Sequence, residues 1–285
     1  MNKKLYQNMF GISQCPVIDF GLGDIVQQAG KMTGRVSISG VQPKLFVGLD
    51  KKKRALVTME DGEYILKPQT ATFPDVPQNE QCCMDMAEEI GIDVPAHCLL
   101  TLNDQSLAYV VKRFDRNKGE KIHQEDFYQI LEARDKYIGS VEQIGRKLKA
   151  ISSVPGLDVQ LLFERVVFNF LIGNGDAHLK NYSIYYPEGQ IRLTPAYDLV
   201  CSRLVVEDHD SALMINGRDD KLGRKDFDAL AEYFKIPVKV RYDRLEGKEK
   251  FMQEMILSSK LDDQKKGRFV DIVRQRYQRL ELKNT

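Results

Sequence analysis

Between residues 44 and 113 the apolar positions come in short runs that are typical of β-strands. Four such runs, rich in β-branched and aromatic residues, lie at residues 45–49, 55–59, 64–66 and 107–112. One stretch with helical spacing interrupts them near residues 80–90. The dense basic run at residues 51–54 lies between two predicted strands and is interpreted as a solvated hairpin tip. This part of the chain is therefore predicted to be a small sheet that carries a helix.

Beyond this sheet the pattern changes to that of helices. Apolar residues recur every three or four positions from residue 141 to 151, and residues 159–172 are apolar on nearly every side, which predicts a helix at the centre of a lobe. Further helices are predicted at residues 224–234, 248–259 and 262–280, and two short strands at residues 183–186 and 190–193. We therefore predict an α+β fold with two lobes, in which residues 1–115 form a small β-rich lobe and residues 116–285 a larger helical lobe.

Composition narrows the classes of protein that fit this pattern. The 42 basic and 41 acidic residues nearly cancel, so no overall charge attracts nucleic acid or an anionic membrane. No run of about 18 apolar residues occurs, and the first residues lack the apolar core of a signal peptide, so we expect a cytoplasmic protein that does not span a membrane. Five cysteines without CxxC pairs predict reduced, mostly buried thiols rather than disulfides or a zinc site.

The motif with the clearest chemistry is Asp-Ala-His-Leu-Lys-Asn at residues 176–181, which Asp198 follows beyond a predicted hairpin. Phosphoryl transfer needs a carboxylate that orients the attacking hydroxyl, and an amide oxygen and a second carboxylate that hold magnesium. Protein kinases place these groups at the spacing found here for Asp176, Asn181 and Asp198. Taken alone, an Asp-(x)4-Asn pattern is equally typical of turns, because both side chains bond the local backbone.

Two features nearer the N-terminus also suggest nucleotide binding. The apolar run at residues 64–66 ends in Lys67, where a kinase places its phosphate-pairing lysine, with Glu80 as a candidate partner. The alternative for Lys67 is a surface lysine that ends a strand. The loop at residues 37–44 is rich in small residues, which let backbone N–H groups approach phosphates. This loop matches neither GxGxxG nor GxxxxGK[ST], so the sequence lacks the main motif of a dinucleotide-binding protein and of a P-loop protein.

In their order and spacing these motifs resemble the HipA family of toxin kinases. The resemblance rests on residues 37–44 (Ser-Ile-Ser-Gly-Val-Gln-Pro-Lys), 65–68 (Ile-Leu-Lys-Pro), 79–80 (Asn-Glu), 112–116 (Lys-Arg-Phe-Asp-Arg), 123–126 (His-Gln-Glu-Asp), 173–181 (Gly-Asn-Gly-Asp-Ala-His-Leu-Lys-Asn) and 195–199 (Pro-Ala-Tyr-Asp-Leu). It extends from about residue 34 to about residue 236. It implies a kinase-like fold, related to the phosphatidylinositol-kinase branch, and an enzyme that phosphorylates a protein with ATP and Mg²⁺.

The resemblance also implies roles for particular residues. Asp176 would be the catalytic residue, and Asn181 and Asp198 the metal ligands. In that family a serine of the small-residue loop is autophosphorylated, which displaces the loop and silences the enzyme; Ser37 matches this serine, and Ser39 is a second candidate. ATP contacts would fall on Ser39, Gly40, Val41, Gln42, Pro43, Lys44, Lys67, Lys112, Arg113, Phe114, His178, Leu179, Lys180, Asn181, Tyr197 and Asp198.

Only about thirty residues precede the serine loop, whereas longer family members carry an N-terminal subdomain there. The chain therefore most resembles the short HipT type, whose missing subdomain is supplied by a separate small protein. This resemblance implies a HipS-like small protein and a HipB-like DNA-binding antitoxin as partners, without direct contact between this chain and nucleic acid. It also implies a protein substrate, with an aminoacyl-tRNA synthetase as the class that the family suggests.

Three other functions stay open at this stage. The chain could be a pseudokinase that acts as a binding module, although Lys67, Asp176, Asn181 and Asp198 are all present. It could be a phosphotransferase that acts on a lipid or another small molecule, although no basic membrane-binding patch stands out. A metal-dependent hydrolase built on Asp176, His178 and Asp198 would lack a second histidine–carboxylate cluster. The motif at residues 123–126 could either shape the cleft or cap a helix.

Overall fold

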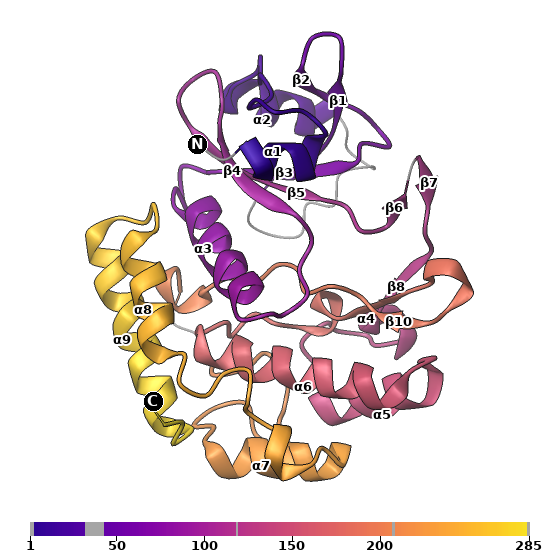
Figure 1. Cartoon of the computed structure of the whole chain (residues 1–285), viewed down its shortest axis with the longest axis vertical. Coiled ribbons are helices and arrows are strands. Elements are labelled where there is room, and N and C mark those ends of the chain that lie inside the picture. Colours follow the sequence, from indigo (N-terminus) through magenta and orange to yellow (C-terminus); the bar gives the residue numbers. More distant parts are fainter. Residues whose placement is uncertain (1–2, 32–42, 118, 207–208, 284–285) are drawn as a thin grey trace. The chain divides into compact units, whose positions relative to one another are not determined.

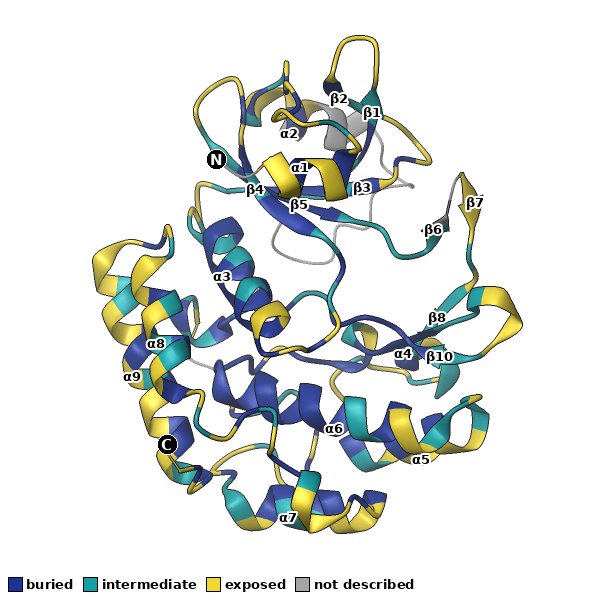
Figure 2. Cartoon of the chain, viewed as in Figure 1, coloured by how far each residue is buried: buried dark blue, intermediate teal, exposed yellow. Residues whose placement is uncertain are grey.

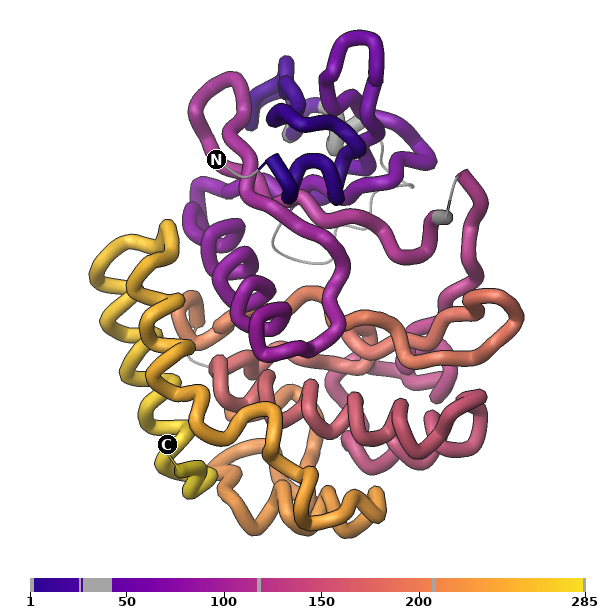
Figure 3. Tube along the Cα trace, in the orientation of Figure 1, coloured from indigo at the N-terminus to yellow at the C-terminus, as the bar shows by residue number. Residues whose placement is uncertain are grey.

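The computed structural model describes residues 3–31, 43–117, 119–206 and 209–283. The chain forms two compact units, one of Met1–Gln81 with Pro95–Glu120 and one of Cys82–Val94 with Lys121–Thr285. The trace in Figure 3 follows the chain out of the first unit, back into it and out again. Helix α3 (Val76–Glu89) begins in the first unit and ends in the second. The division at residues 115 and 116 that the sequence suggested stays a prediction.

The first unit is built on a five-stranded antiparallel sheet with the order β2-β1-β3-β5-β4. Its strands are β1 (Leu45–Asp50), β2 (Ala55–Thr58), β3 (Tyr64–Pro68), β4 (His97–Thr101) and β5 (Leu107–Lys112). Helices α1 (Lys3–Phe10) and α2 (Leu22–Lys31) precede the sheet, and the ribbon of β6 (Arg116–Asn117) and β7 (Glu120–Lys121) follows it. The basic run at residues 51–54 forms the turn between β1 and β2 (Figure 1), which confirms the predicted hairpin tip.

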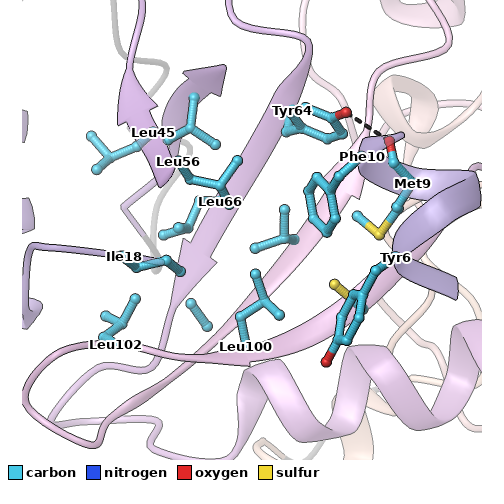
Figure 4. Packing of buried hydrophobic residues seen from close by; sticks show 14 of the residues in the cluster. Tyr6, Met9, Phe10, Ile18, Leu45, Leu56, Tyr64, Leu66, Leu100 and Leu102 are labelled. Atoms are coloured by element: carbon cyan, nitrogen blue, oxygen red, sulfur yellow. Dashed lines mark hydrogen bonds between the residues drawn. The ribbon is translucent and has the colours of Figure 1, made fainter. Parts of the chain in front are cut away.

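Helix α1 closes one part of the core of this unit. Its buried residues Tyr6, Met9 and Phe10 pack with apolar side chains of the sheet (Figure 4). The Tyr64 hydroxyl donates a hydrogen bond of 2.6 Å to the Met9 carbonyl, and its ring lies 4.9 Å from that of Phe10. Burial raises the pKa of Tyr64 to about 12, so the phenol remains a donor at neutral pH. Complete burial of one such apolar side chain contributes about 1.5–3 kcal/mol.

The second unit is mainly helical. Its helices are α4 (Phe127–Ile130), α5 (Val141–Ile151), α6 (Pro155–Leu171), α7 (Arg224–Phe234), α8 (Glu249–Ser258) and α9 (Asp263–Arg279). Its short 3-10 helices are η1 (Leu179–Asn181), η2 (Pro187–Gly189), η3 (Ser202–Leu204) and η4 (Val238–Val240). A small sheet has the order β10-β9-β8, with β8 (Gln124–Asp126), β9 (Ser183–Tyr185) and β10 (Arg192–Leu193). Within the described residues, no helix is long and apolar enough to cross a membrane.

Helix α6 is buried along most of its length (Figure 2), as its apolar pattern predicts. It also carries buried polar side chains that hold the β9–β10 hairpin. The fully buried carboxylate of Asp158 accepts hydrogen bonds from Leu193 N at 3.0 Å and from Arg192 Nε at 3.2 Å. Arg165 donates to the Thr194 carbonyl. The hairpin that separates the two chemically important motifs is thus fixed to the central helix.

The cysteines lead to a labelling prediction. Cys15 is exposed, whereas Cys82, Cys83, Cys98 and Cys201 are buried, which confirms the prediction of mostly buried thiols. Burial raises the pKa of Cys82 and of Cys201 to about 12, which leaves a thiolate fraction of roughly 10⁻⁴ at pH 8. We expect iodoacetamide to modify one thiol rapidly in the native protein at pH 8, with Cys15 as its site by peptide mapping. All five should react in urea, and rapid native labelling of Cys82 or Cys201 would contradict their burial.

Candidate active site

The loop that leaves α6 presents Asp176 through a tightly packed turn. Gly173 has a φ of +70°, and a Cβ there would lie 2.9 Å from Ile272 Cγ2, so only glycine fits without a shift. Asn174 is buried, and its Nδ2 donates to Asn169 Oδ1 at 2.9 Å. Its own Oδ1 accepts a hydrogen bond from Asp176 N at 3.3 Å. The end of the central helix therefore sets the position of Asp176.

The carboxylate of Asp176 is exposed and has an aromatic partner that the sequence did not suggest. The Tyr137 hydroxyl donates a hydrogen bond to Asp176 Oδ1 at 2.9 Å, and its ring meets that of His178 edge-on at 5.3 Å. Tyr137 lies in the irregular segment between α4 and α5, where no periodicity marks a functional residue. Burial, followed by the nearby charge of Lys136, lowers the pKa of His178, so its imidazole is neutral at pH 7.

Asn181 and Asp198 lie side by side although they are seventeen positions apart in the sequence. Asn181 Nδ2 donates to Asp198 Oδ2 at 3.4 Å, and Asn181 Oδ1 accepts a hydrogen bond from His178 N at 3.0 Å. Asp198 has a φ of +54°, in the left-handed region that a non-glycine residue rarely adopts. Such backbone strain, on the order of 1–3 kcal/mol, persists where surrounding contacts enforce it and is frequent at functional sites.

Tyr197, the neighbour of Asp198, is hydrogen-bonded to the loop of residues 178–181. Its hydroxyl donates to the Lys180 carbonyl at 2.8 Å and also bonds the Ser183 hydroxyl. Burial raises the pKa of Tyr197 above its usual range, so the phenol keeps its proton as a donor. Leu179 is fully buried beneath the same loop, whereas Lys180 is exposed with its ammonium 4.6 Å from the centre of the Tyr128 ring. A hydrogen bond therefore joins the segment of residues 178–181 to Tyr197, the residue before Asp198.

The donor types at this point suit a magnesium ion. Mg²⁺ prefers oxygen ligands and is usually held by one or two carboxylates together with the oxygens of a substrate. Asp198 supplies a half-exposed carboxylate, and Asn181 supplies an amide beside it. Because Asn181 Oδ1 accepts from a backbone N–H here, coordination through that oxygen requires the amide to turn. The residues present thus fit the ion, and Asp198 would be its anionic ligand.

In the first unit, Lys67 forms a buried ion pair. Its Nζ lies 2.6 Å from Glu80 Oε1, and the two side chains are only 5% and 3% exposed. The ammonium also lies 5.6 Å from the centre of the Tyr109 ring. The partner expected from the sequence is confirmed, and the alternative of a surface lysine is wrong. A strand lysine paired with a glutamate of the next helix is the arrangement that positions the phosphate-pairing lysine of protein kinases.

The other residues expected to contact ATP have different positions. Lys112 ends β5, and after it Arg113 pairs with Asp115 through Nε at 2.8 Å and Nη2 at 2.7 Å. Burial alone would raise the pKa of Asp115, but Arg113 and then Arg116 outweigh it and lower that pKa. In the sequence, Phe114 comes between Arg113 and Asp115, and Pro43 and Lys44 come directly before β1. Ser37, Ser39, Gly40, Val41 and Gln42 lie outside the described residues.

The motif at residues 123–126 contains a helix cap. Asp126 Oδ1 accepts a hydrogen bond from Gln129 N at 2.8 Å, and Gln129 Oε1 accepts one from Asp126 N at 3.1 Å. This reciprocal pair is a capping box at the start of α4, so the capping alternative is confirmed for Asp126. Glu125 accepts a hydrogen bond of 2.7 Å from the Tyr186 hydroxyl.

Solved structures share this architecture. A chain of the Shewanella oneidensis MR-1 complex of HipA, HipB and its operator DNA aligns with a TM-score of 0.73, over 93% of this chain and 72% of its own length, at 22% identity. The Helicobacter pylori proinflammatory kinase CtkA aligns with a TM-score of 0.57, over 87% of this chain and 92% of its own, at 13% identity. The chain therefore has an α+β, protein-kinase-like fold with a smaller β-rich unit and a larger helical unit.

The family described as "HipA-like C-terminal domain" matches residues 36–264, and the chain belongs to this family. A Haemophilus influenzae protein named "Putative kinase" is 32% identical over 214 residues, which are 70% of this chain and 62% of that protein. The Shewanella oneidensis serine/threonine-protein kinase toxin HipA is 30% identical over 192 residues, 58% of this chain and 43% of that protein. The chain thus spans about half the length of the curated relatives that it matches.

Proposed function

We propose that this chain is a serine/threonine protein kinase of the toxin type, which transfers the γ-phosphate of ATP to a protein. The observation that carries the proposal is the contact of Asn181 with Asp198, because the loop that holds Asn181 also presents an exposed Asp176. Two segments that are separate in the sequence, residues 176–181 and the segment of Asp198, thus supply the groups that phosphoryl transfer needs. The family match and the kinase named among the relatives support the same activity.

In the proposed reaction, Asp176 accepts a hydrogen bond from the serine or threonine hydroxyl and takes its proton. The hydroxyl oxygen forms a bond to the γ-phosphorus while the bond to the β–γ bridging oxygen breaks, which leaves ADP. Asn181 and Asp198 would hold Mg²⁺, which supplies positive charge to the phosphates, and Lys67 would add a further cation. Most of the acceleration would come from positioning and from charge stabilisation.

The finer parts of the proposal extend the family resemblance to regulation and partners. Ser37, or Ser39 in the same loop, would be autophosphorylated, and residues 39–44 would contact ATP. A phosphate there adds about −1.5 to −2 charges beside the nucleotide, so repulsion should weaken ATP binding. The HipA relative of known structure is a complex with HipB and operator DNA, and we propose a HipB-like antitoxin and, for a HipT-type chain, a HipS-like protein as partners. We propose an aminoacyl-tRNA synthetase as the substrate class.

Mass spectrometry tests the activity directly. After incubation of the dephosphorylated protein with Mg-ATP, we expect the intact mass to increase by one phosphate, with peptide mapping that places it on Ser37 or Ser39. The Asp176→Asn variant should remain unmodified, and Asp263→Asn, at an exposed carboxylate of α9, should behave as the wild type. A wild-type protein that binds ATP without gaining phosphate would instead favour the pseudokinase function.

A further inference from the structure

A charged cavity of about 340 Å³ lies in the second unit, away from the proposed catalytic residues. It is lined by Arg203, Asp210, Asp220, Lys221, Ile272, Gln275, Arg276 and Arg279. The first four belong to the segment that follows Asp198 in the sequence, and the last four belong to α9. Neither the sequence motifs nor the proposed reaction uses any of these side chains.

One carboxylate in the lining, that of Asp210, forms ion pairs with three arginines. Asp210 is 2% exposed and accepts hydrogen bonds from Arg203 Nη1 at 3.2 Å and Leu222 N at 2.9 Å. Arg276 Nη2 lies 2.6 Å from Asp210 Oδ1, and Arg279 also donates to this carboxylate. A carboxylate has about four acceptor positions, so these contacts nearly saturate Asp210.

The arginines have more donors than this carboxylate can accept, because each guanidinium carries five N–H groups. The side chain of Arg276 is 4% exposed, and its Nη1 has no hydrogen-bond partner among the described residues. Its guanidinium stacks on Phe170 at 4.3 Å from the ring centre, which fixes it in the wall of the cavity. Because this Nη1 is closed to solvent, Arg276 contributes positive charge to the cavity rather than a hydrogen bond from that atom.

The charge of the lining also indicates an anion. Among the described residues that line the cavity, the four cations Arg203, Lys221, Arg276 and Arg279 outnumber the two carboxylates Asp210 and Asp220 by two positive charges. Burial lowers the pKa of Arg276 to about 10, which still leaves it charged at pH 7.

We propose that this cavity binds the phosphate group of a small phosphorylated molecule. A phosphate monoester carries about −1.5 to −2 charges at pH 7, which matches the local excess, and guanidinium groups bind its oxygens in pairs. The volume lies near the lower end of the roughly 300–1,000 Å³ of small-molecule sites. A neighbouring hollow of about 300 Å³ shares Arg203, Ile272 and Gln275 with it and leaves room for the rest of the ligand.

The cavity is connected to the loop that presents Asp176. Arg203 N donates to the Gly173 carbonyl at 3.3 Å, and Ser202 Oγ accepts from Gly175 N at 2.8 Å. Ile272, on the cavity wall, packs against Gly173. A bound phosphate that joins Arg203 to α9 would therefore brace this loop. This regulatory consequence rests on the proposed kinase function, whereas the binding site itself does not.

Calorimetric titration with inorganic phosphate and with pyrophosphate, in magnesium-free buffer, tests the site. We expect both to bind the wild-type chain, and tighter binding of pyrophosphate would indicate a ligand with more than one phosphate. The double variant Arg203→Gln/Lys221→Gln should bind at least about tenfold more weakly, because two of four cations are removed. Both positions are solvent-accessible, and the single variant Lys221→Gln, at an exposed residue of the lining, should give a smaller loss that is measurable if the double variant folds poorly.

Two matched variants separate this site from general anion attraction and from ATP binding. Arg146→Gln removes an exposed arginine of α5 that lines neither hollow, and it should leave binding unchanged. Asp198→Asn should also retain the binding of both probes, although it should impair the proposed kinase. The proposal is overturned if the wild type binds neither probe, if Arg146→Gln loses as much affinity as the double variant, or if the double variant binds normally.

Discussion

Replacing Asp176 with asparagine is expected to lower phosphoryl transfer by about 10²–10⁴-fold while ATP binding is retained, because this change removes a general base but no group proposed to hold the nucleotide. Asparagine preserves the shape of the side chain and can still accept the hydrogen bond from Tyr137. Its neutral amide cannot take the proton of the attacking hydroxyl. Transfer would be followed with labelled ATP at saturating concentration, and ATP affinity in a separate equilibrium measurement.

The control for this loss is another aspartate of the second unit. Asp263→Asn removes an exposed carboxylate whose partner, Lys266, lies on the same turn of α9, and we expect normal transfer. Asp198→Asn should differ from both variants, since it should weaken the magnesium-dependent part of ATP binding. If Asp176→Asn turned over like the wild type, Asp176 would not be the base and the proposed reaction would need another residue.

Replacing Lys67 with methionine is expected to lower the free energy of unfolding by about 3–5 kcal/mol, because the change removes the cation from a buried ion pair. Glu80 would then be left without this cation in an environment where only 3% of its side chain is exposed. The double variant Lys67→Met/Glu80→Leu should recover most of the loss, since both charges are then replaced by apolar groups. Urea unfolding followed by circular dichroism measures these differences.

Lys53→Met provides the comparison for a lysine at the exposed β1–β2 turn, and its effect should be within about 0.5 kcal/mol. Equal stability of the Lys67 and Lys53 variants would show that the buried pair contributes little to folding. A double variant that is folded but has lost ATP binding would separate the structural role of Lys67 from its proposed role toward the phosphates.

Much of the fold follows from local pattern. The helices α5 and α7 have the bounds that periodicity predicts, because their apolar faces repeat at helical spacing over several turns. Strand β4 was not predicted, since His97–Thr101 does not alternate between polar and apolar residues and is defined by its pairing with β5. The helices α1 and α2 were also missed, because short amphipathic segments give a weak signal before their packing partners are known.

The candidate site, like the fold, could be predicted only in part from the sequence. The motifs indicated the identity and order of Asp176, Asn181 and Asp198, because their spacing matches a known chemical arrangement. The burial of Lys67 could not be predicted, since it depends on α3 and on the ring of Tyr109. Nor could the contact of Tyr137 with Asp176, which joins a loop residue to another 39 positions away. The catalytic and metal-binding roles of these residues remain predictions.

The backbone of Asp198 places two selective pressures in opposition. At a φ of +54°, glycine would have the lower conformational energy, so the aspartate here has a less favourable backbone conformation than glycine would. Selection for folding alone, for example in a library screened only for thermal resistance, should therefore favour glycine at this position. Selection for the proposed chemistry should restore aspartate. The residue found at this position in a variant of the chain would thus indicate whether that variant was selected for the proposed activity or only for stable folding.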